Sequence, residues 1–74
     1  MARGWIHTVY RDGFWLNERE GADRASSRHA TKSEAVARGR ELAIAARTEH
    51  VIHNMDGTIA QRNSYGPDSF PPRG

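Results

Sequence analysis

One stretch of the chain, residues 31–47, has the length and regularity of a helix, and the rest of the fold is organised around it. Thr31 followed by Glu34 is a capping box, in which the hydroxyl and the carboxylate satisfy backbone donors at the start of a helix. The helix is therefore predicted to begin near Lys32. Ile44 falls nearly opposite the apolar side of this helix, as a lone exposed residue or a contact for something else. Apolar and mostly small residues at helical spacing predict a narrow stripe that allows close approach to a sheet: Ala35, Val36, Gly39, Leu42, Ala43 and Ala46.

A hairpin is predicted before the helix. Residues 5–11 alternate in the manner of a strand, and Phe14–Arg19 is the returning strand. Between them, Asp12-Gly13 suits a two-residue type I′ turn, whose central residues need positive φ. In that register Tyr10 faces Trp15.

Both faces of this hairpin carry apolar side chains, and only one of them is needed to cover the helix. Val9, Phe14 and Leu16 share one side with Trp5. The other side is the candidate interaction face, either covered by the C-terminal tail or presented to a partner, and it consists of Ile6, Tyr10 and Trp15.

A second hairpin is predicted after the helix. Residues 51–55 and 58–63 read as strands, and Asp56-Gly57 repeats the turn signal between them. Two hairpins flanking one helix predict an α+β fold, a two-layer ββαββ domain over residues 1–63. We expect a four-stranded antiparallel sheet with the helix packed on one face, and the order of the strands cannot be derived.

The loop before the helix and the C-terminal tail have no periodicity. Residues 21–30 are small and polar and predict a loop, which is either simply solvated or binds phosphate. Residues 64–74 contain three prolines and two glycines and predict an irregular tail packed on the domain by Tyr65 and Phe70. The candidate phosphate contacts in the loop are Arg24, Ser26, Ser27 and Arg28.

Composition restricts the function further. A chain of 74 residues buries only about 60% of its unfolded surface, so a second copy would add stability and a homodimer is expected. The chain has no cysteine, which excludes disulfides and thiolate metal sites. A net charge of +2 is too weak for a dedicated nucleic-acid binder. No apolar run reaches transmembrane length and no signal-peptide core is seen, which favours a cytoplasmic protein without membrane contact.

The sequence gives no pattern for catalysis, a cofactor or a metal. His50 and His53 are expected to point to opposite faces of one strand, and His7 and His29 lie elsewhere, so no metal site is predicted. Asp12 and Asp56 are accounted for as turn residues. The serines lack a nucleophile motif and no glycine-rich phosphate loop is present. We expect a protein that is not an enzyme.

Local phrases spread over almost the whole chain resemble a small bacterial family known as domain of unknown function 2188. The resemblance implies a compact bacterial domain with no assigned activity, substrate, cofactor or catalytic residue. It is carried by the following segments: Asp12-Gly13-Phe14-Trp15, Arg24-Ala25-Ser26-Ser27, Thr31-Lys32-Ser33-Glu34-Ala35-Val36, Val51-Ile52-His53, Asp56-Gly57-Thr58-Ile59, Ser64-Tyr65-Gly66 and Phe70-Pro71-Pro72-Arg73-Gly74.

Two classes of binding function remain. The first is a protein-interaction module, most simply a homodimer that buries an apolar face of the first hairpin or a strand edge. The alternative is nucleic-acid binding, in which Tyr10 and Trp15 stack bases while Arg24 and Arg28 hold phosphates. Binding of the helix in the major groove is disfavoured, because Arg38 is flanked by Glu34 and Glu41 and that face is not a basic stripe.

Overall fold

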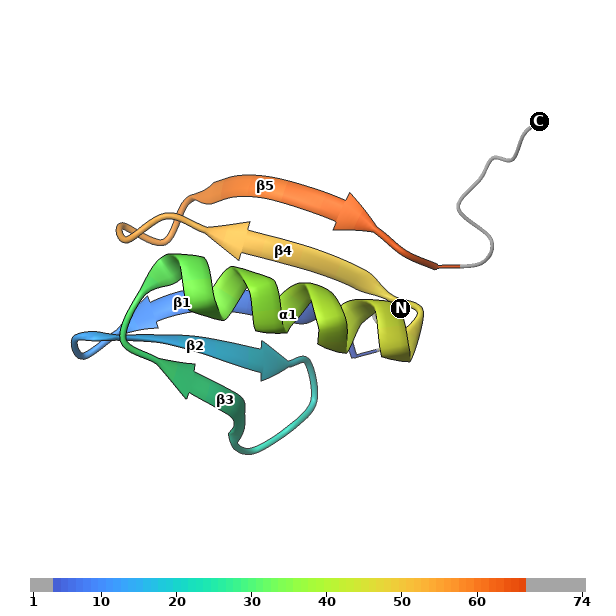
Figure 1. The fold of residues 1–74 in the computed structure, drawn as a ribbon, viewed down its shortest axis with the longest axis horizontal. Helices are drawn as coiled ribbons and strands as arrows, with labels where there is room; N and C mark the ends of the chain where they lie inside the picture. The colour runs from blue at the N-terminus through green and yellow to red at the C-terminus, as the bar shows by residue number, and fades with distance from the viewer. Residues whose placement is uncertain (1–3, 67–74) are drawn as a thin grey trace.

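The described part of the chain combines one helix with a single sheet. Residues 4–66 are described by the computed structural model. Figure 1 shows α1 lying across one face of the sheet, and no described element covers the other face. The elements follow one another as β1 (Ile6–Arg11), β2 (Phe14–Arg19), β3 (Ala25–His29), α1 (Lys32–Ala46), β4 (Glu49–His53) and β5 (Ile59–Ser64).

The first hairpin has the predicted register and turn. β1 and β2 pair antiparallel with Tyr10 opposite Trp15. Asp12 and Gly13 have φ of 53° and 86°, the two positive angles that a type I′ turn requires. Both predictions are confirmed.

β3 is the strand that the sequence analysis missed, because it lies in the segment predicted to be a loop. It pairs antiparallel with the outer side of β2. The side chains that β3 turns toward α1 are Ser27 and His29, so the strand carries no apolar alternation to reveal it. The prediction of a four-stranded sheet is therefore wrong, and the sheet has five strands in the order β3-β2-β1-β4-β5.

The sheet is mixed, not purely antiparallel as predicted. β1 and β4 are parallel neighbours. The connection through α1 returns the chain to the end of the sheet where β3 began, so β4 runs in the same direction as β3. β1 also runs in that direction, because two antiparallel steps separate it from β3. Because the sequence did not predict β3, the expected directions of β4 and β5 relative to β1 were the reverse of those observed.

α1 begins and packs as the sequence predicts. The Thr31 hydroxyl accepts from the Glu34 amide at 3.2 Å, and the helix ends at Arg47, whose left-handed conformation forms the C-cap. Ile44 is exposed by 50%, which agrees with both alternatives and does not decide between them. The helix contacts β1 to β4 but not β5, and its buried residues are Ala35, Gly39 and Ala43.

The second hairpin forms with shifted boundaries. β4 starts at Glu49 and ends at His53, two residues earlier at each end than predicted, because the turn takes residues 54–58. Asp56 closes this turn by accepting from the amide and hydroxyl of Thr58 at 3.0 and 2.7 Å, and these bonds lower the pKa of Asp56. Of the predicted tail packing, only residues 64–66 lie within the described residues.

The face of the first hairpin chosen as the interaction surface is the one that α1 covers. Ile6 is exposed by 1% and Trp15 by 7%, and Tyr10 packs its ring on Trp15 at 5.2 Å between centroids. This choice of face is corrected. The reason is electrostatic: the opposite face carries His7, Arg11 and Glu18, whose charges would be costly to bury beneath a helix.

Candidate functional site

A buried polar network lies between α1 and the centre of the sheet. Thr8, Asn17 and His50 are exposed by 0%, 0% and 1%. His50 Nε2 donates to the Thr8 hydroxyl at 2.7 Å, and that hydroxyl donates to Asn17 Oδ1 at 2.6 Å. Asn17 Nδ2 donates to Ser27 Oγ at 3.0 Å and to the Ala35 carbonyl at 2.9 Å. Both hydrogens of the Asn17 amide are thereby used, and its oxygen accepts one bond.

Gly39 of α1 packs directly against this network on the helix side. A Cβ at Gly39 would stand 2.5 Å from both Asn17 Oδ1 and His50 Nε2, so the helix approaches the sheet more closely than a side chain permits. Burial lowers the pKa of His50, with further contributions from Arg40 and His7, which favours the neutral ring that the network requires. Thr8, Asn17 and His50 are thus closed to solvent.

A second histidine cluster lies on the open face of the sheet. His7 Nδ1 and His53 Nε2 are 2.9 Å apart, and the two ring centroids are 5.2 Å apart. The other nitrogen of His7 lies 2.5 Å from Glu20 Oε2, and His53 Nδ1 lies 3.3 Å from the carbonyl oxygen of Gly57. Four groups thus form a continuous row from Glu20, which directly follows β2, through β1 and β4 to the second turn.

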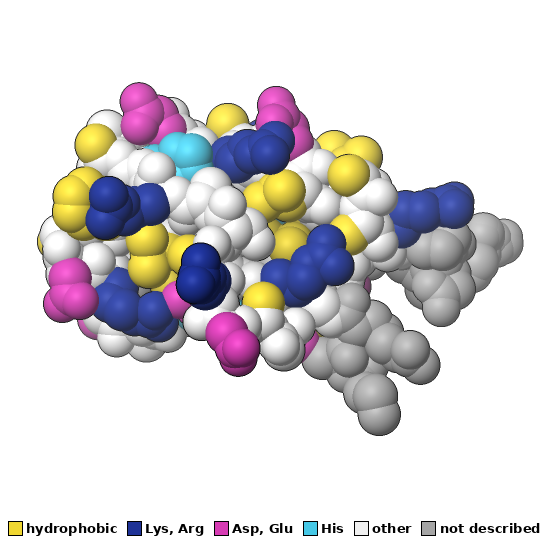
Figure 2. Space-filling model, turned by 90° about the horizontal axis from the view of Figure 1, so that it is seen from below, with side chains coloured by type: hydrophobic (Ala, Val, Ile, Leu, Met, Phe, Trp, Pro, Cys, Tyr) yellow, Lys and Arg dark blue, Asp and Glu magenta, His cyan; other side chains and the backbone are white. Residues whose placement is uncertain are grey.

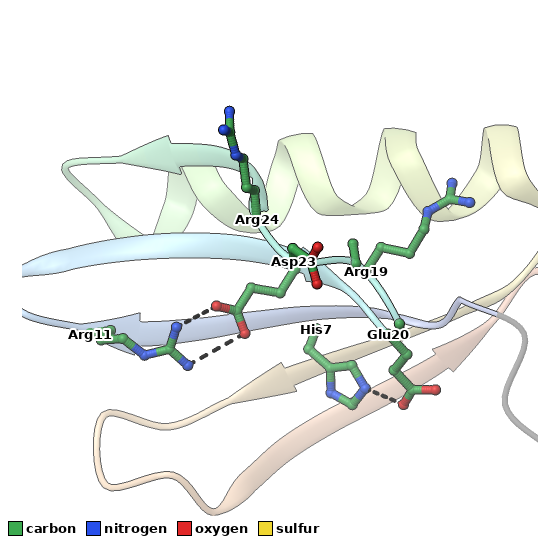
Figure 3. Close-up of a pocket in the computed structure, with 9 residues that line it drawn as sticks. His7, Arg11, Arg19, Glu20, Asp23 and Arg24 are labelled. Atoms are coloured by element: carbon green, nitrogen blue, oxygen red, sulfur yellow. Dashed lines mark hydrogen bonds and ion pairs between the residues drawn. The ribbon is translucent and has the colours of Figure 1, made fainter.

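The cluster adjoins a pocket of about 320 Å³. Arg11 and Glu18 form a two-bonded ion pair there, which raises the pKa of Arg11. Figure 3 shows Arg11 and His7 on one side of the pocket, with Arg19 and Arg24 extending away on the other. Neither Arg19 nor Arg24 pairs with an acidic side chain of the described residues. The pocket is lined by His7, Arg11, Glu18, Arg19, Glu20, Gly21, Ala22, Asp23 and Arg24.

The four candidate phosphate contacts do not form one cluster. Ser27 points inward, where it contacts Asn17 and His29. Arg28 lies on the other face of β3 with its guanidinium 4.6 Å from the centre of the Phe14 ring. Arg24 reaches the pocket, while Ser26 is exposed at the shift in register between β2 and β3. The sequence placed these residues close along the chain, but strand alternation separates their side chains.

Trp15, which was predicted to stack bases together with Tyr10, is covered by other parts of the same chain. Trp15 lies beneath α1, and the Lys32 ammonium is 5.3 Å from the centre of its ring. Figure 2 shows the side of the molecule on which β3 lies, where Lys and Arg side chains stand in separate groups among hydrophobic and acidic ones. This side therefore carries no continuous basic stripe.

The pairing of His7 with His53 was not visible in the sequence. The expectation that His50 and His53 face opposite sides of one strand is confirmed, since His50 points to α1 and His53 to the open face. The contact across β1 and β4 depends on a strand order that periodicity cannot supply. Among residues 4–66, no group of three or more His, Asp or Glu is arranged to hold a metal ion. Over the same residues, no helix has the length and apolarity needed to cross a membrane.

Comparisons with known proteins identify a family without a known activity. Residues 6–65 match the family described as "Uncharacterized protein conserved in bacteria (DUF2188)". The chain is 33% identical over 60 residues to "Uncharacterized protein YdaT" of Bacillus subtilis (strain 168). The matched region covers 81% of this chain but only 40% of that relative. No solved structure matches significantly.

Proposed function

The chain belongs to the DUF2188 family of uncharacterized bacterial proteins, and from this premise we propose that it is a non-enzymatic interaction module that self-associates through β5. The observation that carries the proposal is the exposure of this strand. β5 contacts β4 and lies beyond the reach of α1, and all its residues but Asn63 are exposed. Among residues 4–66, β5 has one paired edge and no layer on either face, and such a strand is a template for pairing with another chain.

The outer edge of β5, which pairs with no other described strand, has few of the features that prevent such pairing. The strand contains no proline, and its one charged residue, Arg62, is held 3.3 Å from Glu49. Two large apolar side chains near the start of β5 are also exposed, Met55 by 64% and Ile59 by 62%. Charge and proline are the common means of protecting an edge. This edge therefore favours association.

A second copy of the chain is the partner that fits this edge most directly. The same strand on two copies can pair antiparallel about a two-fold axis, which extends the sheet and closes the assembly at a dimer. The small size of the domain adds a physical reason, because a dimer increases the fraction of surface buried.

The test is light scattering coupled to gel filtration, with Arg62→Pro compared against Arg62→Ala. Tyr65 N–H donates to the Thr48 carbonyl, so by alternation Asn63 and Gln61 bond to β4 and the amide of Arg62 points to the free edge. Proline at position 62 removes this outward donor, whereas alanine removes only the side chain. We expect a dimer for the wild type and for Arg62→Ala, and a monomer for Arg62→Pro.

Salt and nucleic acid separate this proposal from the alternative. The dimer is expected to persist at high salt and to ignore a mixed pool of single- and double-stranded nucleic acid, since backbone pairing and apolar contact depend little on screening. A monomeric wild type that elutes with nucleic acid only at low salt would overturn the proposal.

A further inference from the structure

The row of groups on the open face of the sheet contains three polar contacts, and each contact needs one hydrogen. The Glu20 carboxylate accepts from His7 Nε2 at 2.5 Å, and the Gly57 carbonyl accepts from His53 Nδ1 at 3.3 Å. Both partners are acceptors, so both outer nitrogens carry a hydrogen. The inner nitrogens, His7 Nδ1 and His53 Nε2, point end-on at each other at 2.9 Å, which is the geometry of one N–H···N hydrogen bond between the rings.

Two neutral rings cannot supply the hydrogens that this row requires. A neutral imidazole carries one N–H and an imidazolium carries two. Two neutral rings therefore leave one of the three contacts without a hydrogen, and two imidazoliums place two N–H groups against each other at the inner contact. One extra proton on the pair satisfies all three contacts. The pair of rings then carries one positive charge, and the Glu20 carboxylate carries the opposite charge.

The surroundings of Glu20 favour this charge on the pair. Among residues 4–66, Glu20 forms its ion pair with His7 alone, and Glu20 Oε1 is buried without a hydrogen-bond partner. A carboxylate that is partly shielded from water is stabilised by a cation on the ring it contacts. The side chains of His7 and Glu20 are 24% and 30% exposed, so the proton can exchange with solvent.

The other charges beside His7 do not compete for this position. Glu18 lies opposite His7 in the strand pairing, and its carboxylate is bonded to Arg11. Arg19 and Arg24 extend away from His7 on the other side of the pocket (Figure 3). The pocket that His7 lines also contains Asp23.

The charges on β4, the second turn and β5 have partners of their own. Glu49 is paired with Arg62 at 3.3 Å, and the Asp56 carboxylate accepts from Thr58. His50 points to α1, where burial lowers its pKa and favours the neutral ring. Glu20 is thus the carboxylate in direct contact with the pair of rings.

We propose that His7 and His53 form a proton-operated clamp, in which one proton bound by the two rings together ties the second turn to β1. His7 lies in β1 and His53 ends β4, while Gly57 lies in the turn that follows. Loss of the proton leaves two hydrogens for three contacts, and the longest contact, from His53 to the exposed Gly57 carbonyl, is the one that opens. Histidines gain and lose protons between about pH 5 and 8. The clamp therefore closes as the pH falls through this range and opens as the pH rises.

A second proton on the pair is disfavoured. It would place two positive rings end-on, with nitrogens 2.9 Å apart and no acceptor between them. Two rings that interact in this way titrate in separate steps that belong to the pair. In the unfolded chain each histidine binds its own proton, so the clamp is measured at the turn and not through global stability. The clamp is independent of association through β5.

Side-chain ¹⁵N NMR spectra recorded between pH 5 and 8 test the proton count. In the wild type, the rings of His7 and His53 should titrate together and take up one proton between them, with both outer nitrogens in the N–H form at the lower pH. Glu20→Gln should weaken the uptake of this proton at least about tenfold, because it removes the charge that the imidazolium contacts. His29→Gln is the matched control and should leave the titration unchanged. Two rings that titrate independently, with one proton each at pH 5, would overturn the proposal.

Hydrogen exchange at the second turn tests the clamp itself. The amides of Asn54 and Gly57 bond within this turn, to the carbonyls of Thr58 and Asn54 at 2.7 and 3.0 Å. Their protection, corrected for the intrinsic pH dependence of exchange, should fall roughly 2- to 10-fold between pH 5.5 and 8, which corresponds to the loss of one hydrogen bond. The amides of the first hairpin are the internal control and should keep their protection.

His53→Gln links the two measurements. It should abolish the pH dependence of protection at the second turn, because glutamine does not titrate, while His29→Gln should retain it. Amide dispersion equal to that of the wild type shows that each variant is folded. Protection that is independent of pH in the wild type, or equally dependent on pH in His53→Gln, would overturn the proposal.

Discussion

The two histidine networks lie on opposite faces of the same sheet and differ in completeness. In the network of His50, Thr8 and Asn17, every hydrogen bond has a donor and an acceptor, and α1 shields the network from water. Around His7 and His53, the row ends in acceptors on both sides and lies open to solvent. Buried polar groups stabilise a fold only when all are satisfied. The comparison therefore separates a network that is buried and shielded from solvent from one that is open to solvent.

The inner network also explains why the stripe on α1 consists of small residues. Gly39 lies directly over the polar groups, and Ala35 supplies the carbonyl that accepts from Asn17. An ordinary apolar core would place larger side chains at this point of a helix. Close approach of the helix backbone replaces those contacts and makes the fold sensitive to a single methyl group.

Gly39→Ala is predicted to have the largest effect on stability. In an open helix this substitution stabilises by up to about 1 kcal/mol, because alanine has the higher helix propensity. Here the new Cβ meets Asn17 Oδ1 and His50 Nε2 at 2.5 Å, and overpacking of this kind costs about 1–3 kcal/mol. We expect a net loss in the free energy of unfolding, measured with urea, with the exposed Ser33→Ala as control. A gain in stability would contradict the close approach.

Sequence patterns predicted the features that depend on local chemistry. Thr31 caps α1 and Asp12-Gly13 forms the turn as expected, because each requirement is met within a few neighbouring residues. β3 was missed because Ser27 and His29 replace apolar residues on its inner side, where they join the polar network.

The candidate site depended on information that periodicity does not contain. His7 and His53 are 46 residues apart and meet only because β4 pairs with β1. The correct choice of hairpin face, by contrast, was available from the sequence. His7, Arg11 and Glu18 alternate on one side, and a face with three titratable groups is a poor surface for a helix to cover.

Stability is predicted to fall as the pH decreases, through His50. Burial lowers the pKa of His50 in the folded protein. Below about pH 6.5, His50 of the unfolded chain therefore binds a proton, whereas His50 of the folded chain stays neutral to lower pH. The stabilisation is fully present above that pH and is lost as the pH falls toward the folded pKa. One proton limits the slope to about 1.4 kcal/mol per pH unit.

Urea unfolding at pH 7.5 and 5.5 measures this slope. His50→Gln should reduce it, since glutamine does not titrate, while His29→Gln on the edge strand should retain it. Identical slopes in the wild type and His50→Gln would show that the inner network does not exclude the proton. The two faces of the sheet would then be less distinct than the burial of His50 indicates.

The smallest effect is expected at the ion pair between Arg11 and Glu18 on the open face. The Arg11 side chain is 54% exposed and that of Glu18 is 31% exposed, so solvent screens most of their attraction despite the two hydrogen bonds. A double-mutant cycle with Arg11→Ala and Glu18→Ala should give a coupling energy of about 0.2–1 kcal/mol. That energy should decrease further in 1 M salt. A coupling above this range that resists salt would mean that the open face is covered in solution by another molecule.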